Sequence, residues 1–116
     1  MTHAAQFING QWLAGEGAEF SSLNPAKGEV IWSATAATAE QVDTAIKAAR
    51  EAFYSWTDLT FEQRLEIVKK FAEQLAENKD AFAKVIALET GKPLWETATE
   101  VGAMIGKIGI SEKAYF

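Results

Sequence analysis

The sequence contains no cysteine and a single histidine, His3, among its 116 residues. Without a thiol, these residues offer no disulfide, no thiolate metal ligand and no cysteine nucleophile. His3 has no second histidine or cysteine with which to share a metal, so we interpret it as part of a solvated tail. No serine–histidine pair can be assembled either. The sequence therefore predicts no catalytic, cofactor-binding or metal-binding residue in this segment.

Positive charge is also scarce: 11 lysines and arginines stand against 16 aspartates and glutamates, a formal net charge of −5. Nucleic-acid binding needs clustered positive charge, so a nucleic-acid partner is not expected. No apolar run is long enough to span a bilayer, and the first residues lack the pattern of a secretory signal. With 48% hydrophobic and 23% charged residues, the composition is globular. We expect a cytoplasmic protein without a membrane partner.

Residues 1–36 carry strand and turn signals. Asn9-Gly10 lies between apolar residues, which is the strongest short-range signal of a β-hairpin, because both residues tolerate a positive φ. A second turn is predicted at residues 24–28, where proline and glycine favour a chain reversal. The predicted strands lie in residues 7–13, 19–24 and 30–34. We predict that they form one small antiparallel sheet.

The periodicity becomes helical over residues 38–116. Thr38 with Gln41, and Thr60 with Gln63, have the spacing of a capping box, in which each side chain bonds an orphan backbone N–H. An apolar stripe at helical spacing follows each of these caps. The two stripes are Val42, Ala45, Ile46, Ala49, Ala52, Phe53 and Trp56, and then Phe61, Leu65, Val68, Ala72 and Leu75.

Two further helices are predicted after these. Asn78 is the expected cap of a third helix, and Gly91 ends it, because glycine takes the left-handed conformation at little cost. Pro93 follows, where it cannot extend the third helix but can open a fourth that starts near Leu94. The segment is therefore α+β, with a small antiparallel N-terminal sheet followed by about four helices.

The fourth predicted helix contains Gly102, Gly106 and Gly109. Each glycine costs roughly 0.5–1 kcal/mol relative to alanine in a helix interior. We therefore predict that another element packs closely against this face, a weak and frayed helix being the alternative. Residues 111–116 still follow the helical pattern and end on two aromatics, so we expect the segment to be the N-terminal part of a longer protein.

Two glutamate pairs have helical spacing. They are Glu62 with Glu66, and Glu96 with Glu100. Each pair lies on one face of a helix and has the chemistry to bind a cation or to transfer a proton. A solvated charged face is the interpretation that we favour, because charge runs on helices usually lie outside.

Other patterns resemble known sites only in part. Gly15-Glu16-Gly17 lacks the third glycine and the strand–helix context of a dinucleotide loop. The residues 90–93 lack the upstream glycine of a phosphate loop, and Pro93 stands where a hydroxyl is required. The four tryptophans lie on apolar faces and are interpreted as core residues. They are Trp12, Trp32, Trp56 and Trp95.

Taken together, a series of short stretches resembles the N-terminal segment of the NAD(P)-dependent aldehyde dehydrogenase superfamily. The matching stretches are residues 8–12, 24–30, 45–53, Trp56, Arg64, 89–94 and Glu100-Val101. Their order and spacing cover essentially the whole segment. Within that family, residues 92–101 and 103–108 are most similar to the N-succinylglutamate 5-semialdehyde dehydrogenases of arginine degradation.

The resemblance implies that the segment is part of the α/β cofactor domain of an aldehyde dehydrogenase. The complete protein would oxidise an aldehyde with NAD(P) through a cysteine thioester, and it would be a homo-oligomer. The nucleophile and the cofactor-binding loop would lie beyond Phe116, so this segment is expected to be inactive and to bind no NAD. The helix over residues 100–113 would flank the substrate tunnel, with Ala103, Met104 and Lys107 as the positions of interest.

The resemblance also implies partners: the aldehyde, the remainder of the same chain and, for the isolated segment, further copies of itself. A competing interpretation is a self-sufficient helical interaction module without catalysis. It predicts a cooperative, monomeric unfolding transition with no exposed apolar face.

Overall fold

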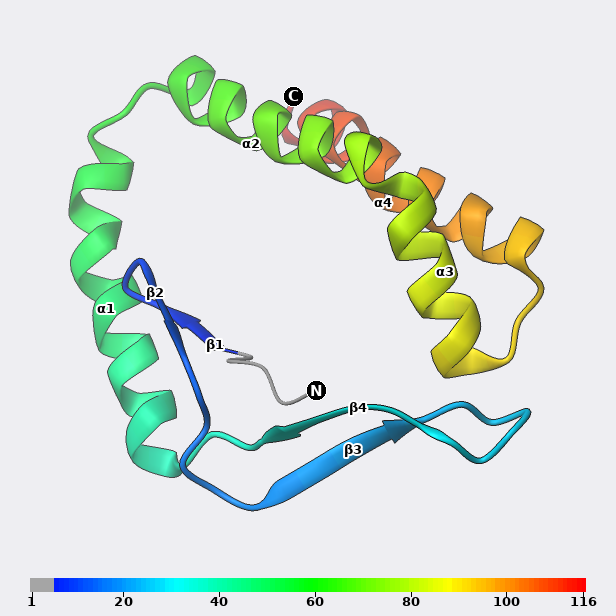
Figure 1. Ribbon diagram of the computed structural model, residues 1–116. Helices are drawn as coiled ribbons and strands as arrows, with labels where there is room; N and C mark the ends of the chain where they lie inside the picture. Colours follow the sequence, from blue (N-terminus) through cyan, green and yellow to red (C-terminus); the bar gives the residue numbers. More distant parts are fainter. Residues whose placement is uncertain (1–5) are drawn as a thin grey trace. The chain divides into compact units, whose positions relative to one another are not determined.

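The computed structural model describes residues 6–116, and His3 lies outside them. The chain divides into two compact units, Met1–Leu59 and Thr60–Phe116. Four short strands and helix α1 (Ala39–Thr57) form the first unit, and three helices form the second (Figure 1). The α+β fold class is confirmed. The first helix belongs to the strand-containing unit, so the units divide after Leu59.

The first hairpin forms where Asn9-Gly10 predicts it. Strand β1 (Gln6–Ile8) pairs antiparallel with β2 (Gln11–Leu13). Asn9 and Gly10 have φ values of 51° and 77°, the left-handed pair that a two-residue hairpin turn requires. The positive φ at both turn residues lets the two short strands follow the twist of a hairpin.

The second hairpin joins β3 (Glu19–Leu23) to β4 (Val30–Thr35). Asn24 organises the predicted turn between them. Its side-chain oxygen accepts from the amide of Ala26 at 2.9 Å, and its carbonyl accepts from Gly28 at 2.8 Å. Gly28 has a φ of 72°, which returns the chain into β4.

The strands form two separate two-stranded sheets, where the sequence predicted one. The loop after β2 explains the division. The amide of Gly17 donates to Ala36 O at 2.8 Å, and the hydroxyl of Thr35 donates to Gly15 O at 2.6 Å. This loop therefore bonds to the last residue of β4 and to the residue after it, and it separates the two hairpins. A Cβ on Gly15 would lie 2.0 Å from Thr35 O, so the approach requires glycine.

Helix α1 begins at the predicted capping box, and Gln41 does more there than cap the helix. Its Oε1 accepts from the amide of Thr38 at 3.1 Å and from the amide of Glu16 at 3.0 Å. Its Nε2 donates to Ala14 O at 3.0 Å. The Thr38 hydroxyl accepts in turn from the amide of Gln41. One side chain thus joins the start of α1 to the loop after β2.

The second unit consists of α2 (Phe61–Glu77), α3 (Lys79–Thr90) and α4 (Leu94–Tyr115). Helix α4 packs against both α2 and α3 (Figure 1). The capping box of Thr60 and Gln63 is confirmed, with distances of 2.9 and 3.2 Å. At the far end of α4, Tyr115 stacks on Phe61 with ring centroids 4.4 Å apart, which ties α4 to the start of α2.

Asn78 occupies the predicted cap position of α3 but does not cap it with its side chain. Its side-chain nitrogen donates to Gln74 O at 2.9 Å, at the end of α2. No side-chain cap is present at α3. The prediction of a capping side chain was wrong, because α2 and α3 follow each other so directly that the same residue ends one helix and begins the next.

Few apolar side chains are buried among residues 6–116. The buried apolar residues are Ala34, Leu75, Ala83 and Val101. Helix α1 has no buried residue, although its sequence is amphipathic. The prediction that the tryptophans are core residues was wrong within these residues. Trp32 is half-buried, whereas Trp12, Trp56 and Trp95 are 67%, 39% and 73% exposed.

We predict that Gln41→Ala destabilises the first unit more than Gln63→Ala destabilises the second. Both changes remove a capping box, but only Gln41 also bonds a distant loop. The additional loss is roughly 1–2 kcal/mol, because two further hydrogen bonds are removed and each contributes about 1 kcal/mol or less at an exposed site. Hydrogen exchange at the Glu16 amide measures it directly, since Gln41→Ala should accelerate exchange there and Gln63→Ala should not.

Gln41→Glu is the matched variant, because it keeps the two accepting contacts and loses the donor to Ala14 O. It should retain most of the protection at Glu16. Equal exchange rates in all three variants would contradict the proposed role of this side chain.

Candidate functional site

The turn between α3 and α4 is the most organised polar region of the second unit. Gly91 has a φ of 75° and its amide donates to Ala87 O at 2.9 Å, which ends α3 as predicted. The Thr90 hydroxyl donates to Ile86 O at 2.7 Å and accepts from the amide of Lys92 at 3.3 Å. Pro93, with a φ of −60°, then opens α4 without a side-chain cap.

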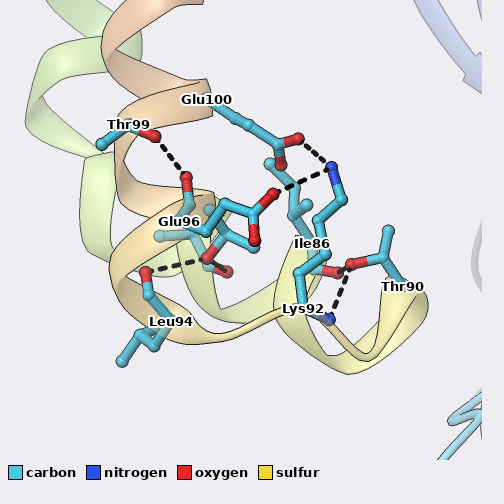
Figure 2. Close-up of polar contacts among 9 residues, drawn as sticks. Ile86, Thr90, Lys92, Leu94, Glu96, Thr99 and Glu100 are labelled. Atoms are coloured by element: carbon cyan, nitrogen blue, oxygen red, sulfur yellow. Dashed lines mark hydrogen bonds and ion pairs between the residues drawn. The ribbon is translucent and has the colours of Figure 1, made fainter.

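Lys92 joins this turn to α4 through its side chain. Its ammonium group bonds a carboxylate oxygen of Glu100 and lies 3.7 Å from Glu96. Figure 2 shows the lysine bridging two successive turns of α4. The hydrogen bond that Lys92 donates to Glu100 is the main cause that raises the pKa of Lys92, followed by the negative charge of Glu100. The lysine therefore stays protonated and holds the start of α4 to the turn.

Thr97 forms the second connection between the two helices, and it is fully buried. Its hydroxyl oxygen lies 2.8 Å from Ala83 O in α3 and 3.0 Å from Leu94 O in its own helix. A buried hydroxyl without a partner is costly, so both carbonyls matter to its placement. Ala83 is itself 3% exposed, and its small side chain lets α4 approach α3 closely.

These contacts decide what the predicted charged sites do. The Glu96–Glu100 pair does bind a cation, but that cation is Lys92 of the same turn. Glu62 and Glu66 are exposed, as the solvated-face interpretation predicts. Among residues 6–116 no group of acidic or histidine side chains is arranged to hold a metal ion.

The glycine-containing patterns likewise do not fit a nucleotide. The loop with Gly15 and Gly17 is filled by the backbone of Thr35 and Ala36, so no phosphate fits against it. Lys92, the other candidate for a phosphate contact, is paired with two carboxylates. Neither of these two patterns therefore has the features of a phosphate-binding loop.

Apolar surface is the remaining feature of interest. An open groove along the C-terminal half of α1 is lined by Ala49, Ala52, Phe53, Ser55, Trp56 and, beyond the helix, Leu59. A second hollow, which shares Ala49 and Ala52 with this groove, lies between α1 and the β1–β2 turn at Asn9 and Gly10. On α4, the three positions that the resemblance singles out, Ala103, Met104 and Lys107, are all exposed. None of the helices in residues 6–116 combines the length and apolar character needed to cross a membrane.

Comparisons with known proteins agree on one family. Residues 12–114 match the sequence profile of the aldehyde dehydrogenase family. The chain belongs to the aldehyde dehydrogenase family. Its fold matches that part of betaine aldehyde dehydrogenase from Staphylococcus aureus, solved in complex with NAD+, with a TM-score of 0.84 and 31% identity. That match covers 90% of this chain and 22% of the other.

A second structure extends the comparison to another aldehyde dehydrogenase-like enzyme. The NADP-dependent glyceraldehyde-3-phosphate dehydrogenase of Bacillus halodurans C-125, complexed with NADP, matches with a TM-score of 0.81 and 28% identity. The match covers 85% of this chain and 21% of that enzyme. The chain therefore spans about a fifth of the length of the aldehyde dehydrogenases that it resembles.

Sequence reasoning found the α3–α4 turn but missed its main contacts. Glu89 to Pro93 indicated where one helix ends and the next begins, yet the spacing of Lys92, Glu96 and Glu100 was not used. A lysine four and eight residues before two glutamates, at the start of a helix, is a detectable signal. The bond from Thr97 to Ala83 has no such signal, because it depends on how two helices pack.

Thr97→Val should lower the stability of the α3–α4 pair by about 1 kcal/mol, because the buried hydroxyl loses its bond to α3 while the volume is kept. Thr99→Val is the control, since the Thr99 hydroxyl is exposed and bonds Glu96 O within its own helix. Amide exchange in α3 and α4 is the measurement. If both variants exchange alike, the hydroxyl does not hold the helices together.

Lys92→Met should loosen the start of α4, and the effect should depend on pH and salt. Because the pKa of Lys92 is raised on folding, its contribution is complete below about pH 10.4, the ordinary lysine value, and is lost as pH rises through the raised pKa. Added salt should weaken it, since the pair is partly exposed.

Lys47→Met provides the comparison, because Lys47 pairs with one carboxylate, Asp43, in a highly exposed position. The difference between wild type and Lys92→Met in α4 exchange should be constant from neutral pH to about pH 10 and then shrink. A difference that persists unchanged at higher pH would mean that packing of the lysine stem, not its charge, is responsible.

Proposed function

We propose that this chain is a non-catalytic scaffold portion of an NAD(P)-dependent aldehyde dehydrogenase. The observation that carries the proposal is the family match over residues 12–114, combined with the short share of the related enzymes that the chain spans. The scaffold contributes helices and hairpins that support a cofactor domain. The remainder of the enzyme supplies the reacting groups.

The exposed apolar side chains support this role. Ile46 and Phe53 of α1 are 62% and 47% exposed, and Phe71 of α2 is 60% exposed. Soluble monomers rarely leave large apolar patches uncovered, and each of the two units exposes several large apolar side chains. We propose that further residues of the same polypeptide cover them in the complete enzyme. A self-sufficient interaction module would instead bury the apolar stripe of α1 within its own fold.

The chemistry of the family requires residues that this chain lacks. Covalent aldehyde oxidation needs an activated thiol and a positioned base, and the chain has no cysteine. We therefore propose that only the complete enzyme binds NAD and oxidises the aldehyde, with a carboxylate as the product. The isolated segment is proposed to be inactive, and its uncovered faces make self-association its expected behaviour.

For the substrate we propose N-succinylglutamate 5-semialdehyde, which would be converted to N-succinylglutamate in arginine catabolism. The support is the resemblance of residues 92–101 and 103–108 to the dehydrogenases of that aldehyde. A cytoplasmic homo-oligomer is the proposed form of the complete enzyme. Betaine aldehyde and glyceraldehyde 3-phosphate are the competing substrates to include in the test, since the related structures are named for them.

The decisive experiment measures NADH formation by the complete enzyme with the three aldehydes, under matched conditions. We expect the highest kcat/KM with N-succinylglutamate 5-semialdehyde. Preference for another aldehyde would overturn the substrate proposal and leave the family role intact. Calorimetry on residues 1–116 alone should show no NAD binding, and micromolar binding would overturn the scaffold proposal.

The glycines of α4 offer a structural test of the same proposal. A Cβ on Gly102, Gly106 or Gly109 would meet no atom within 4 Å among residues 60–116, apart from the neighbouring backbone of α4 itself. The predicted close packing is therefore absent within the residues described. The buried face of α4 carries Thr97 and Val101, and the glycines lie outside that face.

Gly106→Ala should accordingly stabilise the isolated segment by roughly 0.5–1 kcal/mol, the difference in helix propensity between the two residues. In the complete enzyme the same change should lower the melting temperature, because a covering element would meet the added methyl group. Stabilisation of similar size in both would show that this face stays open, and would favour the stand-alone module.

A further inference from the structure

We draw no further inference here: the strongest candidate, the open apolar groove on α1 lined by Ala49, Ala52, Phe53, Trp56 and Leu59, carries nothing because no contact among residues 6–116 shows what covers it.

Discussion

The close approach of α3 and α4 at Ala83 and Thr97 is the contact on which the second unit depends. The alanine leaves room for α4, and the threonine hydroxyl bonds the Ala83 carbonyl at 2.8 Å inside that contact. Val101, fully buried one turn further along α4, completes the contact with apolar packing. Lys92 then joins the turn to the start of α4 from the outside, where solvent and salt weaken its charge pairs. The buried bond orders the helices, and the charged one reinforces the turn.

Polar contacts organise the first unit in a comparable way, because little apolar surface is buried there. Gln41 satisfies the helix start and the loop after β2 with one side chain, and the glycines of that loop allow the backbone to approach residues 35–36. Directional hydrogen bonds place these elements precisely but contribute only about 1 kcal/mol each to net stability. Burial of the apolar stripe of α1 would stabilise the unit much more, but no residue of α1 is buried among the described residues. That imbalance is what a supporting part of a larger enzyme domain would show.

The local signals in the sequence were reliable wherever one residue type has one dominant backbone preference. The predicted turns and helix ends formed at five places. They are Asn9-Gly10, Asn24 to Gly28, the two capping boxes and Gly91-Lys92-Pro93. The prediction failed where one residue had two available roles, as at Asn78, which bonds backward to α2. It also failed for the tryptophans, since amphipathic spacing indicates which face is apolar and not whether that face is covered.

The sequence by itself determined the class of fold, the positions of the helix ends and the membership in the aldehyde dehydrogenase family. Each follows from short-range chemistry or from motifs in a fixed order. Only the tertiary structure decided that the strands form two sheets, that the Thr97 hydroxyl bonds the Ala83 carbonyl, and that the glycine face of α4 meets no other element among residues 60–116. These features depend on which residues distant in sequence come together, and no local preference specifies that.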